Sequence, residues 1–476
     1  MKWSKSAKRS AAVVCLAGGV VAGCGADKSK PVEPTQRESF LQAVAWRDVQ
    51  EKVEPLSTAD NEWACPRTHG MKILYADKHH AVKALPNATP DDFADLYAVL
   101  ADASKVNLTG MAERVCCGQD QPTILRVRPS QLGRLLAELQ KISSGCAPLV
   151  KLPSAPFEQV EPGSLTPVYP VDKPRDEVRQ VACHLDVEKN VRMTVDELSK
   201  WNNRHAGSDT GRKASEQLQH WYETAAGQRN KRDVEVVPKN HNFSDVKQPS
   251  VIITIHGTAP AADRHRVLLG AHIDSINELD SGDQEARKAP GADDDASGIA
   301  IGLEIFRALM AAGVTFERTV EIHAYAAEEF GLWGSGQIAN EHLAPNDIEA
   351  MLQLDMSFYS AKNDEKVWVA RGSEQCTDPD LSAAVFSLGK IYTGPGAGWV
   401  TVPVKGFGTS DHRAFGLKGF RTAWLFEEEP NPRIHTADDT SEGGRWNAKF
   451  VKNNTLVTLA YLMHFAGGHP QSACPK

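Results

Sequence analysis

From about residue 181 to its end at residue 476, the chain alternates short apolar stretches with amphipathic ones. Such alternation predicts an α/β domain with a mixed, largely parallel central sheet and helices on both faces. We expect strands at residues 251–255, 266–271, 319–326 and 351–354, and helices at 191–202, at 213–223 and from a capping Ser297 to near Gly313. In sheets of this kind ligands bind in the loops beyond the carboxyl ends of the strands, so those loops hold the candidate site.

Imidazole and carboxylate side chains occur in five separate loops at the ends of these predicted strands. They are His272 with Asp274, the run Asp293–Asp294–Asp295, the pair Glu328–Glu329, Asp355, and His435. Taken singly, each is as ordinary as a buried histidine or a solvated acidic loop. Together they suit zinc, and two zinc ions that share a bridging carboxylate need about five protein ligands.

The sequence around these residues resembles a known enzyme family. The segments GAHIDS, PGADDDASG, YAAEEFGLWGS, LQLDMS and NPRIHTADDT are similar, in order and spacing, to the metal-binding motifs of the bacterial leucyl aminopeptidases. These are two-zinc exopeptidases with glutaminyl cyclase and transferrin-receptor-like relatives. The resemblance covers roughly residues 185–465. It implies the zinc exopeptidase fold and an enzyme with two Zn²⁺ per chain that cleaves the first peptide bond of peptides with a free N-terminus.

The resemblance also implies a role for each motif residue. His272 and Asp355 would bind one zinc ion, Glu329 and His435 the other, and Asp294 would bridge both. These five residues form the expected ligand set.

Other motif residues would assist the ligands. Glu328 would be the general base, because a carboxylate that is not a ligand must move the proton of the attacking water. Asp274 would hold the far nitrogen of His272 and so fix its tautomer. Asp293 and Asp295 would be supports.

One position departs from the family pattern. The chain keeps Ser410-Asp411-His412, but Phe407 stands where family members have a tyrosine whose hydroxyl helps to stabilise the tetrahedral intermediate. Phenylalanine has no donor. Either zinc stabilises the oxyanion alone or another group replaces the hydroxyl.

Apolar residues close to the expected ligands suggest a pocket for the first side chain of the substrate. They are Met356, Phe407, Trp424, Phe426 and Ile434. Such a pocket would favour Leu, Met or Phe as the first residue. The alternative is that Trp424 and Phe426 are ordinary core residues.

The N-terminus predicts export. Residues 1–23 have a basic start followed by an apolar run, as in a secretory signal peptide. Residues 21–24, ending in Cys24, resemble a bacterial lipobox, which implies cleavage before Cys24 and its lipidation. We therefore expect a lipoprotein of the bacterial cell envelope, with a membrane as partner through the lipid and Gly25 favouring the outer membrane. The alternative is a plain signal peptide in which Cys24 is incidental.

The rest of the chain divides into four parts. We expect a tether at 24–64, a small α/β or α+β N-terminal domain at 65–150, a Pro-rich linker at 151–180 and the catalytic domain at 181–476. In the small domain we expect strands at 72–75 and 123–127, a helix at 91–102 and another beginning at Ser130. This domain is a possible propeptide, and we predict that it covers the active site until it is cut.

Composition excludes other classes of protein. The chain is 41% hydrophobic and 24% charged, which is ordinary for a globular protein, and its net charge of −8 argues against nucleic-acid binding. Seven cysteines follow Cys24 without a CxxC or zinc-finger spacing, so disulfides are plausible in an exported chain. We expect a monomer.

Three alternatives to the aminopeptidase were weighed. A glutaminyl cyclase-type enzyme normally works with one zinc ion, and a non-catalytic peptide-binding member of the superfamily has lost ligands. The complete set of five ligands, with Glu328, argues against both. A carboxypeptidase needs a basic clamp for the substrate carboxylate, and no motif marks one.

Overall fold

The computed structural model describes residues 171–227, 233–243, 245–260, 265–277, 286–342, 348–371, 376–401, 409–442 and 446–472, and shorter stretches nearer the N-terminus (41–45, 73–76, 80–84, 96–99, 105–116, 123–128, 131, 134–135, 138–139 and 149–151). The predicted signal peptide, Cys24 and Phe407 lie outside the described residues, as do most of the predicted tether and linker.

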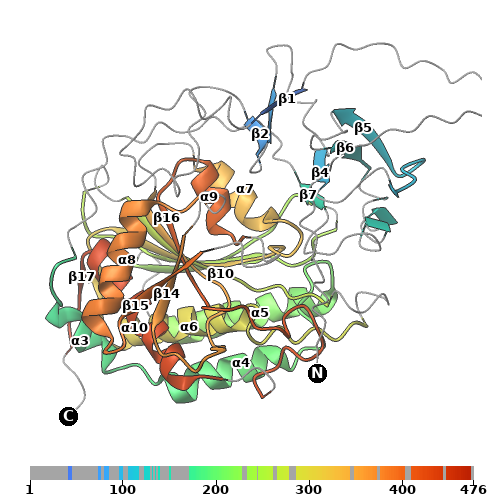
Figure 1. The fold of residues 1–476 in the computed structure, drawn as a ribbon. Helices are drawn as coiled ribbons and strands as arrows, with labels where there is room; N and C mark the ends of the chain where they lie inside the picture. The colour runs from blue at the N-terminus through green and yellow to red at the C-terminus, as the bar shows by residue number, and fades with distance from the viewer. Residues whose placement is uncertain are drawn as a thin grey trace, which may run out of the picture.

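An eight-stranded mixed sheet with the order β15-β14-β16-β13-β10-β12-β9-β8 forms the centre of the C-terminal domain (Figure 1). Its strands are β8 (Val234–Lys239), β9 (Ser250–Ile255), β10 (Arg266–His272), β12 (Thr319–Tyr325), β13 (Ile348–Leu354), β14 (Val367–Arg371), β15 (Ala397–Thr401) and β16 (Thr422–Phe426). β10 runs parallel to both of its neighbours, β12 and β13, and β13 runs parallel to β16. The carboxyl ends of these four strands therefore meet at one edge of the sheet, as the sequence predicted.

Helices cover both faces of the sheet. They are α3 (Asp176–Ala182), the π-helix η4 (Val187–Val191), α4 (Arg192–Ser199), α5 (Asp209–Ala226), α6 (Ala296–Ala311), α7 (Trp333–Glu341), α8 (Pro379–Tyr392), α9 (His412–Leu417) and α10 (Ala448–Phe465). A short ladder joins β11 (Thr315–Phe316) to β17 (Gly468–His469). The helix predicted at 191–202 is shorter than expected, and the one at 213–223 is longer. Among the described residues, no helix is both long enough and apolar enough to cross a bilayer.

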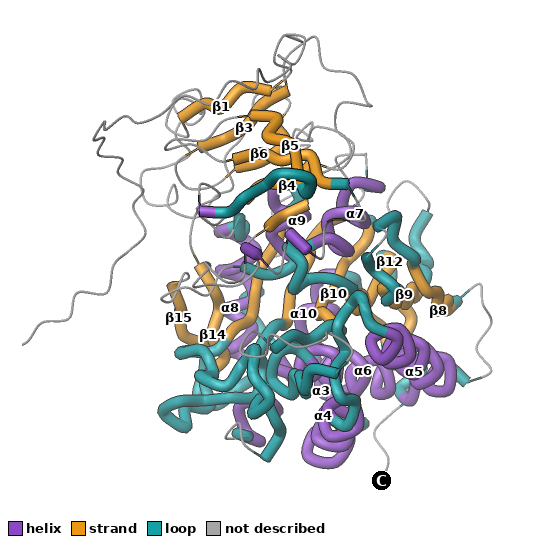
Figure 2. Tube along the Cα trace, turned by 90° about the vertical axis from the view of Figure 1, so that its right-hand side faces the viewer, coloured by secondary structure: helices purple, strands orange, loops and turns teal. Residues whose placement is uncertain are grey.

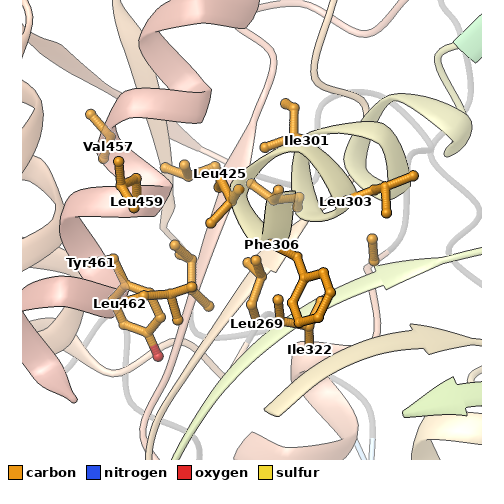
Figure 3. Close-up of a cluster of buried hydrophobic side chains, with 14 of the residues drawn as sticks. Leu269, Ile301, Leu303, Phe306, Ile322, Leu425, Val457, Leu459, Tyr461 and Leu462 are labelled. Atoms are coloured by element: carbon orange, nitrogen blue, oxygen red, sulfur yellow. The ribbon is translucent and has the colours of Figure 1, made fainter. Parts of the chain in front are cut away.

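The core lies between the sheet and the larger helical layer. Leu269 on β10 and Ile322 on β12 pack with Phe306 of α6 and with Leu462 of α10 in one buried cluster (Figure 3). Leu268, which precedes Leu269 in β10, points to the opposite face of the sheet and packs with residues of α7 and α9. Successive strand residues point to opposite faces, so a strand that is apolar throughout is buried on both sides.

Helix α6 is capped by Asp295, and the prediction that Ser297 would be the cap is wrong. The Asp295 carboxylate accepts a hydrogen bond from the Gly298 backbone N–H at 2.9 Å. The Ser297 hydroxyl instead donates to the Asp293 carbonyl at 2.7 Å. Gly313 follows the helix with φ of 65°, a left-handed conformation that favours glycine at a helix end.

The described residues between 41 and 151, here called the N-terminal unit, contain two antiparallel sheets. One has the order β1-β3-β2 and the other β5-β6-β4-β7. The strands are β1 (Leu41–Ala45), β2 (Ile73–Ala76), β3 (His80–Ala84), β4 (Leu96–Val99), β5 (Ala112–Cys116), β6 (Thr123–Val127) and β7 (Leu149–Lys151). The strand predicted at 123–127 is β6, and the one predicted at 72–75 is β2, one residue later. Leu135 and Leu139 are helical and buried, as their spacing predicted.

The helix predicted over residues 91–102 is wrong, because part of that segment forms β4. β4 pairs with β6 on one side and with β7 on the other. Tyr97 and Val99 belong to one buried cluster. Residues two positions apart lie on the same face of a strand, so this pattern is the one that a strand gives. The apolar spacing around Leu96 and Tyr97 also fits a helical face, and pairing with two neighbouring strands overrides that local pattern.

Three cysteines in the described residues form disulfide bonds. They are Cys116 in β5, Cys183 after α3 and Cys376 before α8.

Candidate metal centre and active site

The structure brings the five expected ligands together at the carboxyl edge of the sheet. His272 is the last residue of β10, and Asp355 directly follows β13. Asp294 lies just before α6, Glu329 lies in the loop after β12, and His435 lies in the loop after β16. Parallel strands explain this meeting of distant residues, because their ends lie side by side.

Asp294 lies between the two histidines. Its Oδ1 is 2.9 Å from Nε2 of His272, and its Oδ2 is 2.9 Å from Nε2 of His435. All three side chains are largely buried. A carboxylate that presents one oxygen to each of two imidazoles is placed to bridge two cations.

Each histidine also has a carboxylate of its own. Oδ1 of Asp355 is 3.7 Å from Nε2 of His272, and Oε2 of Glu329 is 3.1 Å from Nε2 of His435. Two groups of three ligand atoms include Asp294, and the atoms of each group lie within 4.8 Å of one another: one is His272, Asp294 and Asp355, the other Asp294, Glu329 and His435. A third group joins His272 with Glu328 and Glu329. The two groups around Asp294 contain the same residues as the two expected zinc sites.

The donor set fits zinc. It combines imidazole nitrogen with carboxylate oxygen, the ligands of catalytic zinc sites. Oε1 of Glu329 is buried and has no hydrogen-bond partner. Buried polar atoms normally have a partner, and a metal ion bound here would supply one. The carboxylates of Asp355, Asp274 and Asp294 outweigh the effect of burial and raise the pKa of His272 well above its usual value, so the site attracts positive charge.

Glu328 stands beside the ligands. One of its carboxylate oxygens lies within 4.8 Å of ligand atoms of His272 and Glu329. It is partly exposed, unlike Glu329, which is buried. Removal of its carboxyl from water raises the pKa of Glu328 well above the usual value. A carboxyl with a raised pKa beside a metal site can take and return a proton.

Asp274 acts mainly on the loop of the two glutamates. Its carboxylate accepts the backbone N–H groups of Glu328 at 3.0 Å and of Glu329 at 3.1 Å. Nδ1 of His272 is 3.2 Å from the Asp274 backbone carbonyl and 3.6 Å from its carboxylate. The contact expected from the sequence is therefore made by the main chain, and the side chain fixes the Glu328–Glu329 pair.

Three further aspartates, Asp293, Asp295 and Asp439, hold the backbone around Asp294 and His272. The carboxylate of Asp439 accepts the backbone N–H of Asp293 at 3.0 Å and that of Asp294 at 3.2 Å. Asp295 accepts the backbone N–H of His272 at 3.1 Å. The side chain of Asp293 accepts from Asn431 at 2.9 Å. Its other oxygen accepts the backbone N–H of Phe358 at 3.2 Å. Each of these carboxylates therefore accepts at least one backbone N–H near a candidate ligand, which is compatible with the supporting role expected for Asp293 and Asp295.

Arg204 places a buried positive charge behind this acidic centre. Its guanidinium donates to the carbonyls of Ile273 at 2.8 Å and Gly291 at 2.8 Å, and also to that of Pro290. Burial lowers its pKa to about 10, and the carboxylate of Asp439 is the strongest opposing influence. Arg204 thus connects the loop after β10 with the loop before α6 and offsets part of their negative charge.

The triplet Ser410-Asp411-His412, which the sequence singled out, is buried and contacts the end of β13. Nε2 of Gln353 donates to Oγ of Ser410 at 3.0 Å and to Oδ2 of Asp411 at 3.1 Å. Burial raises the pKa of Asp411 to about 7. His412 is fully buried and its ring lies 4.9 Å from that of Trp424.

Four of the five expected pocket residues form one cluster. Met356, Trp424, Phe426 and Ile434 are 2–7% exposed and pack with Ala370 and Val400. Two of them adjoin candidate ligands in the chain: Met356 follows Asp355, and Ile434 precedes His435. The cluster, here called the apolar wall, belongs to the buried core: Trp424 and Phe426 are each 2% exposed, which fits the alternative that they are ordinary core residues.

Reasoning from the sequence missed Asp439, Glu427 and Arg204 as parts of the site. Asp439 stands in the segment NPRIHTADDT, and Arg204 stands where the catalytic domain begins. Glu427 accepts the backbone N–H groups of Tyr359 at 2.8 Å and Asn431 at 3.0 Å. The sequence signal for these three residues was weak, because each is only a charged residue within or near a motif.

Comparison of the sequence with known proteins gives one family. The model of peptidase family M28 matches residues 250–460. Leucine aminopeptidase 1 of Fusarium vanettenii is 32% identical over 307 residues, which cover 61% of this chain and 74% of that protein. Leucine aminopeptidase 1 of Paracoccidioides brasiliensis (strain Pb03) is 32% identical over 338 residues, which cover 65% of this chain and 81% of that protein.

Solved structures agree with the fold. The LapA aminopeptidase of Legionella pneumophila superposes with a TM-score of 0.61 at 23% identity, over 78% of this chain and 97% of that one. LapB of the same organism superposes with a TM-score of 0.59, over 78% of this chain and 99% of that one. By the sequence of its catalytic domain and by its relatives, the chain belongs to peptidase family M28.

Proposed function

We propose that this member of family M28 is a two-zinc aminopeptidase that removes single apolar residues from the N-terminus of peptides. The observation that carries the proposal is the position of Asp294, with one carboxylate oxygen 2.9 Å from each of two histidines. That the chain is a zinc-dependent aminopeptidase follows from its relatives. The number of metal ions, the residue roles and the substrate preference are the proposed part.

Five residues would hold the two ions. His272 and Asp355 would bind one, Glu329 and His435 the other, and Asp294 both. Zinc bound here lowers the pKa of water and stabilises negative charge that develops on the substrate carbonyl oxygen.

Glu328 supplies the proton transfer. Its carboxylate takes a proton from the attacking water and gives it to the amine that leaves when the peptide bond breaks. Glu328 meets the geometric requirement because it lies against the ligands without belonging to either of the two groups around Asp294. The Asp274 carboxylate keeps it there through the backbone amides of both glutamates.

The apolar wall supports a preference for Leu, Met or Phe as the first residue. Met356, Trp424, Phe426 and Ile434 place hydrocarbon and aromatic groups near the candidate ligands, and Met356 and Ile434 adjoin two of them in the chain. Burial of a substrate side chain among such groups would contribute about 1.5–3 kcal/mol. A charged first residue would lose its hydration there without gaining a partner.

The enzyme is further proposed to act at the bacterial cell envelope. The basic and apolar start of the chain and the lipobox-like residues before Cys24 support export and lipidation. Cell fractionation tests this: the full chain should sediment with membranes, and Cys24→Ala should not receive the lipid. A Cys24→Ala protein that still carries an acyl chain would contradict the proposal.

The decisive experiment uses the chain that starts after Cys24. Release of leucine is followed from a peptide that begins with Leu, from the same peptide with an acetylated N-terminus, and from peptides that begin with Lys or Gln. Zinc is counted by elemental analysis. Glu328→Gln is compared with Glu341→Gln, a surface glutamate on α7 whose change should be neutral.

We expect two zinc ions per chain, leucine release only from the free N-terminus, and slow release from the Lys peptide. Glu328→Gln should keep both ions and lose activity by about 10²–10⁴-fold, the usual contribution of a positioned acid–base group. One zinc ion with ring closure of the Gln peptide would replace the proposal by a cyclase. Two zinc ions without any turnover would indicate a binding protein.

A further inference from the structure

The apolar core of the N-terminal unit includes residues of the catalytic domain. Its buried members in the N-terminal unit are Tyr97, Val99, Leu125, Val127, Leu135 and Leu139, and those in the catalytic domain are Ala206, Ala327 and Trp333. Figures 1 and 2 both place β4 next to α7. The two parts therefore share one core instead of merely touching.

Trp333, the first residue of α7, is at the centre of the shared core. It is 2% exposed. Its ring lies 5.7 Å from that of Tyr97, 5.1 Å from that of Phe243 and 5.3 Å from that of Phe330. Aromatic pairs at these separations attract each other beyond the effect of buried area. Tyr97 is the member of this group that the N-terminal unit supplies.

The segment from residue 326 to 333, here called the glutamate loop, connects Trp333 to the catalytic centre. The backbone N–H of Trp333 donates to the Ala327 carbonyl at 3.0 Å. The N–H groups of Gly331 and Leu332 both donate to the Glu328 carbonyl at 2.8 Å. Through these hydrogen bonds a displacement of Trp333 would displace Glu328.

Ala327 shows that this loop depends on its surroundings. Its φ is 56°, a left-handed conformation that residues other than glycine rarely adopt. Such a conformation persists only where the surrounding structure determines it. Ala327 is fully buried in the shared core, and on the inner side Asp274 holds the next two residues, Glu328 and Glu329. The N-terminal unit covers the outer side.

We propose that the N-terminal unit, through Tyr97 against Trp333, holds the glutamate loop in its working position and is a permanent part of the active enzyme. Tyr97 is then a positioning residue. The sequence suggested the opposite role, a cap that blocks the site until it is cut. The inference rests on the proposed function only where it concerns the activity of Glu328, because the position of the loop can be measured without any substrate.

The test uses the chain that starts after Cys24, with its N-terminal unit intact. Tyr97→Ala removes the ring, and Tyr97→Phe keeps it. Phe386→Ala is the matched control, because Phe386 stacks on Trp399 at 4.4 Å in another part of the domain. Hydrogen–deuterium exchange of the peptide that contains residues 326–334 is measured without zinc, and zinc affinity and kcat are measured separately.

We expect Tyr97→Ala to speed exchange of the Glu328 and Glu329 amides by at least about tenfold, because local opening becomes easier. Zinc affinity and kcat should fall by roughly 10–100-fold, as for other groups that orient ligands. Tyr97→Phe should behave like the parent protein, and Phe386→Ala should leave exchange of the loop unchanged. If Tyr97→Ala does not fold, Tyr97→Leu, which keeps apolar volume, takes its place.

Unchanged exchange and unchanged zinc affinity in Tyr97→Ala would overturn the inference. So would a rise in kcat, which would establish the N-terminal unit as a cap. Faster exchange of the loop in a protein that never releases an N-terminal residue would support the positioning role and refute the proposed peptidase activity instead. The two failures are thus distinguishable.

Discussion

The side chain of Asp439 accepts a hydrogen bond at 3.2 Å from the backbone N–H of Asp294, although the two residues are 145 positions apart in the chain. Its other oxygen accepts from the backbone N–H of Asp293, so the loop that carries Asp294 is held from a distant segment. We predict that Asp439→Asn, which turns an amide donor toward this loop, weakens zinc binding by about 10–100-fold. Competition with a chelator measures this. Asp438→Asn, at the exposed neighbouring position, should have no effect.

We predict that replacing Arg204 greatly lowers the free energy of unfolding. It is fully buried among the carboxylates of the site, and it donates to carbonyls on two loops. Arg204→Met leaves those acids without their buried counter-charge, which should cost about 3–5 kcal/mol of the free energy of unfolding. Urea unfolding of the zinc-free protein measures the loss. Arg212→Met, at a partly exposed ion pair on α5, should cost no more than about 1 kcal/mol, and similar losses in both variants would contradict the prediction.

Zinc affinity should rise with pH. Burial alone would lower the pKa of His272, but the carboxylates of Asp355, Asp274 and Asp294 raise it well above the usual value. Without metal the imidazole therefore keeps its proton near neutral pH, and zinc must displace that proton to bind. Titrations between pH 6 and about 8 should show tighter binding at each higher pH. An affinity that does not change across this range would show that His272 is already neutral.

We predict that the folded protein loses stability in acid because of two buried histidines outside the metal centre, His241 and His464. Burial lowers the pKa of His241 from 6.5 to about 4, and that of His464 from 6.5 to about 4. Between these values the unfolded chain binds more protons than the folded one, so stability is fully present above pH 6.5 and falls as pH drops toward about 4. The midpoint of thermal unfolding across this window measures the effect. His241→Gln should flatten the pH dependence, and a curve as steep as that of the parent protein would exclude His241 as a cause.

The ligand set could be predicted from the sequence because topology places it. His272 and Asp355 stand at the ends of neighbouring parallel strands, so any chain with these strands brings them together. The contacts of Asp274 and Asp439 could not be predicted in the same way. Their partners are backbone amides, which every residue has, and only the folded loops decide which amide an acidic side chain meets.

The N-terminal unit was predicted less well for a related reason. Residues 96–99 have an apolar pattern that fits both a helix and a strand, and strand partners on both sides decide between them. The contact between Tyr97 and Trp333 in the shared core also left no mark in the sequence, because these two residues are separated by more than 200 positions. Contacts between distant segments determine this part of the molecule.

The spread of the five ligands along the chain sets the order of events during maturation. The first, His272, ends β10, and the last, His435, lies in the loop after β16, so the set is complete only when β10, β12, β13 and β16 have come together. Closing such long loops is slow and occurs late in folding. A fragment that lacks any of these strands lacks part of the set, so tight binding of the two proposed metal ions would be a checkpoint: a chain that binds both has already assembled this part of its central sheet.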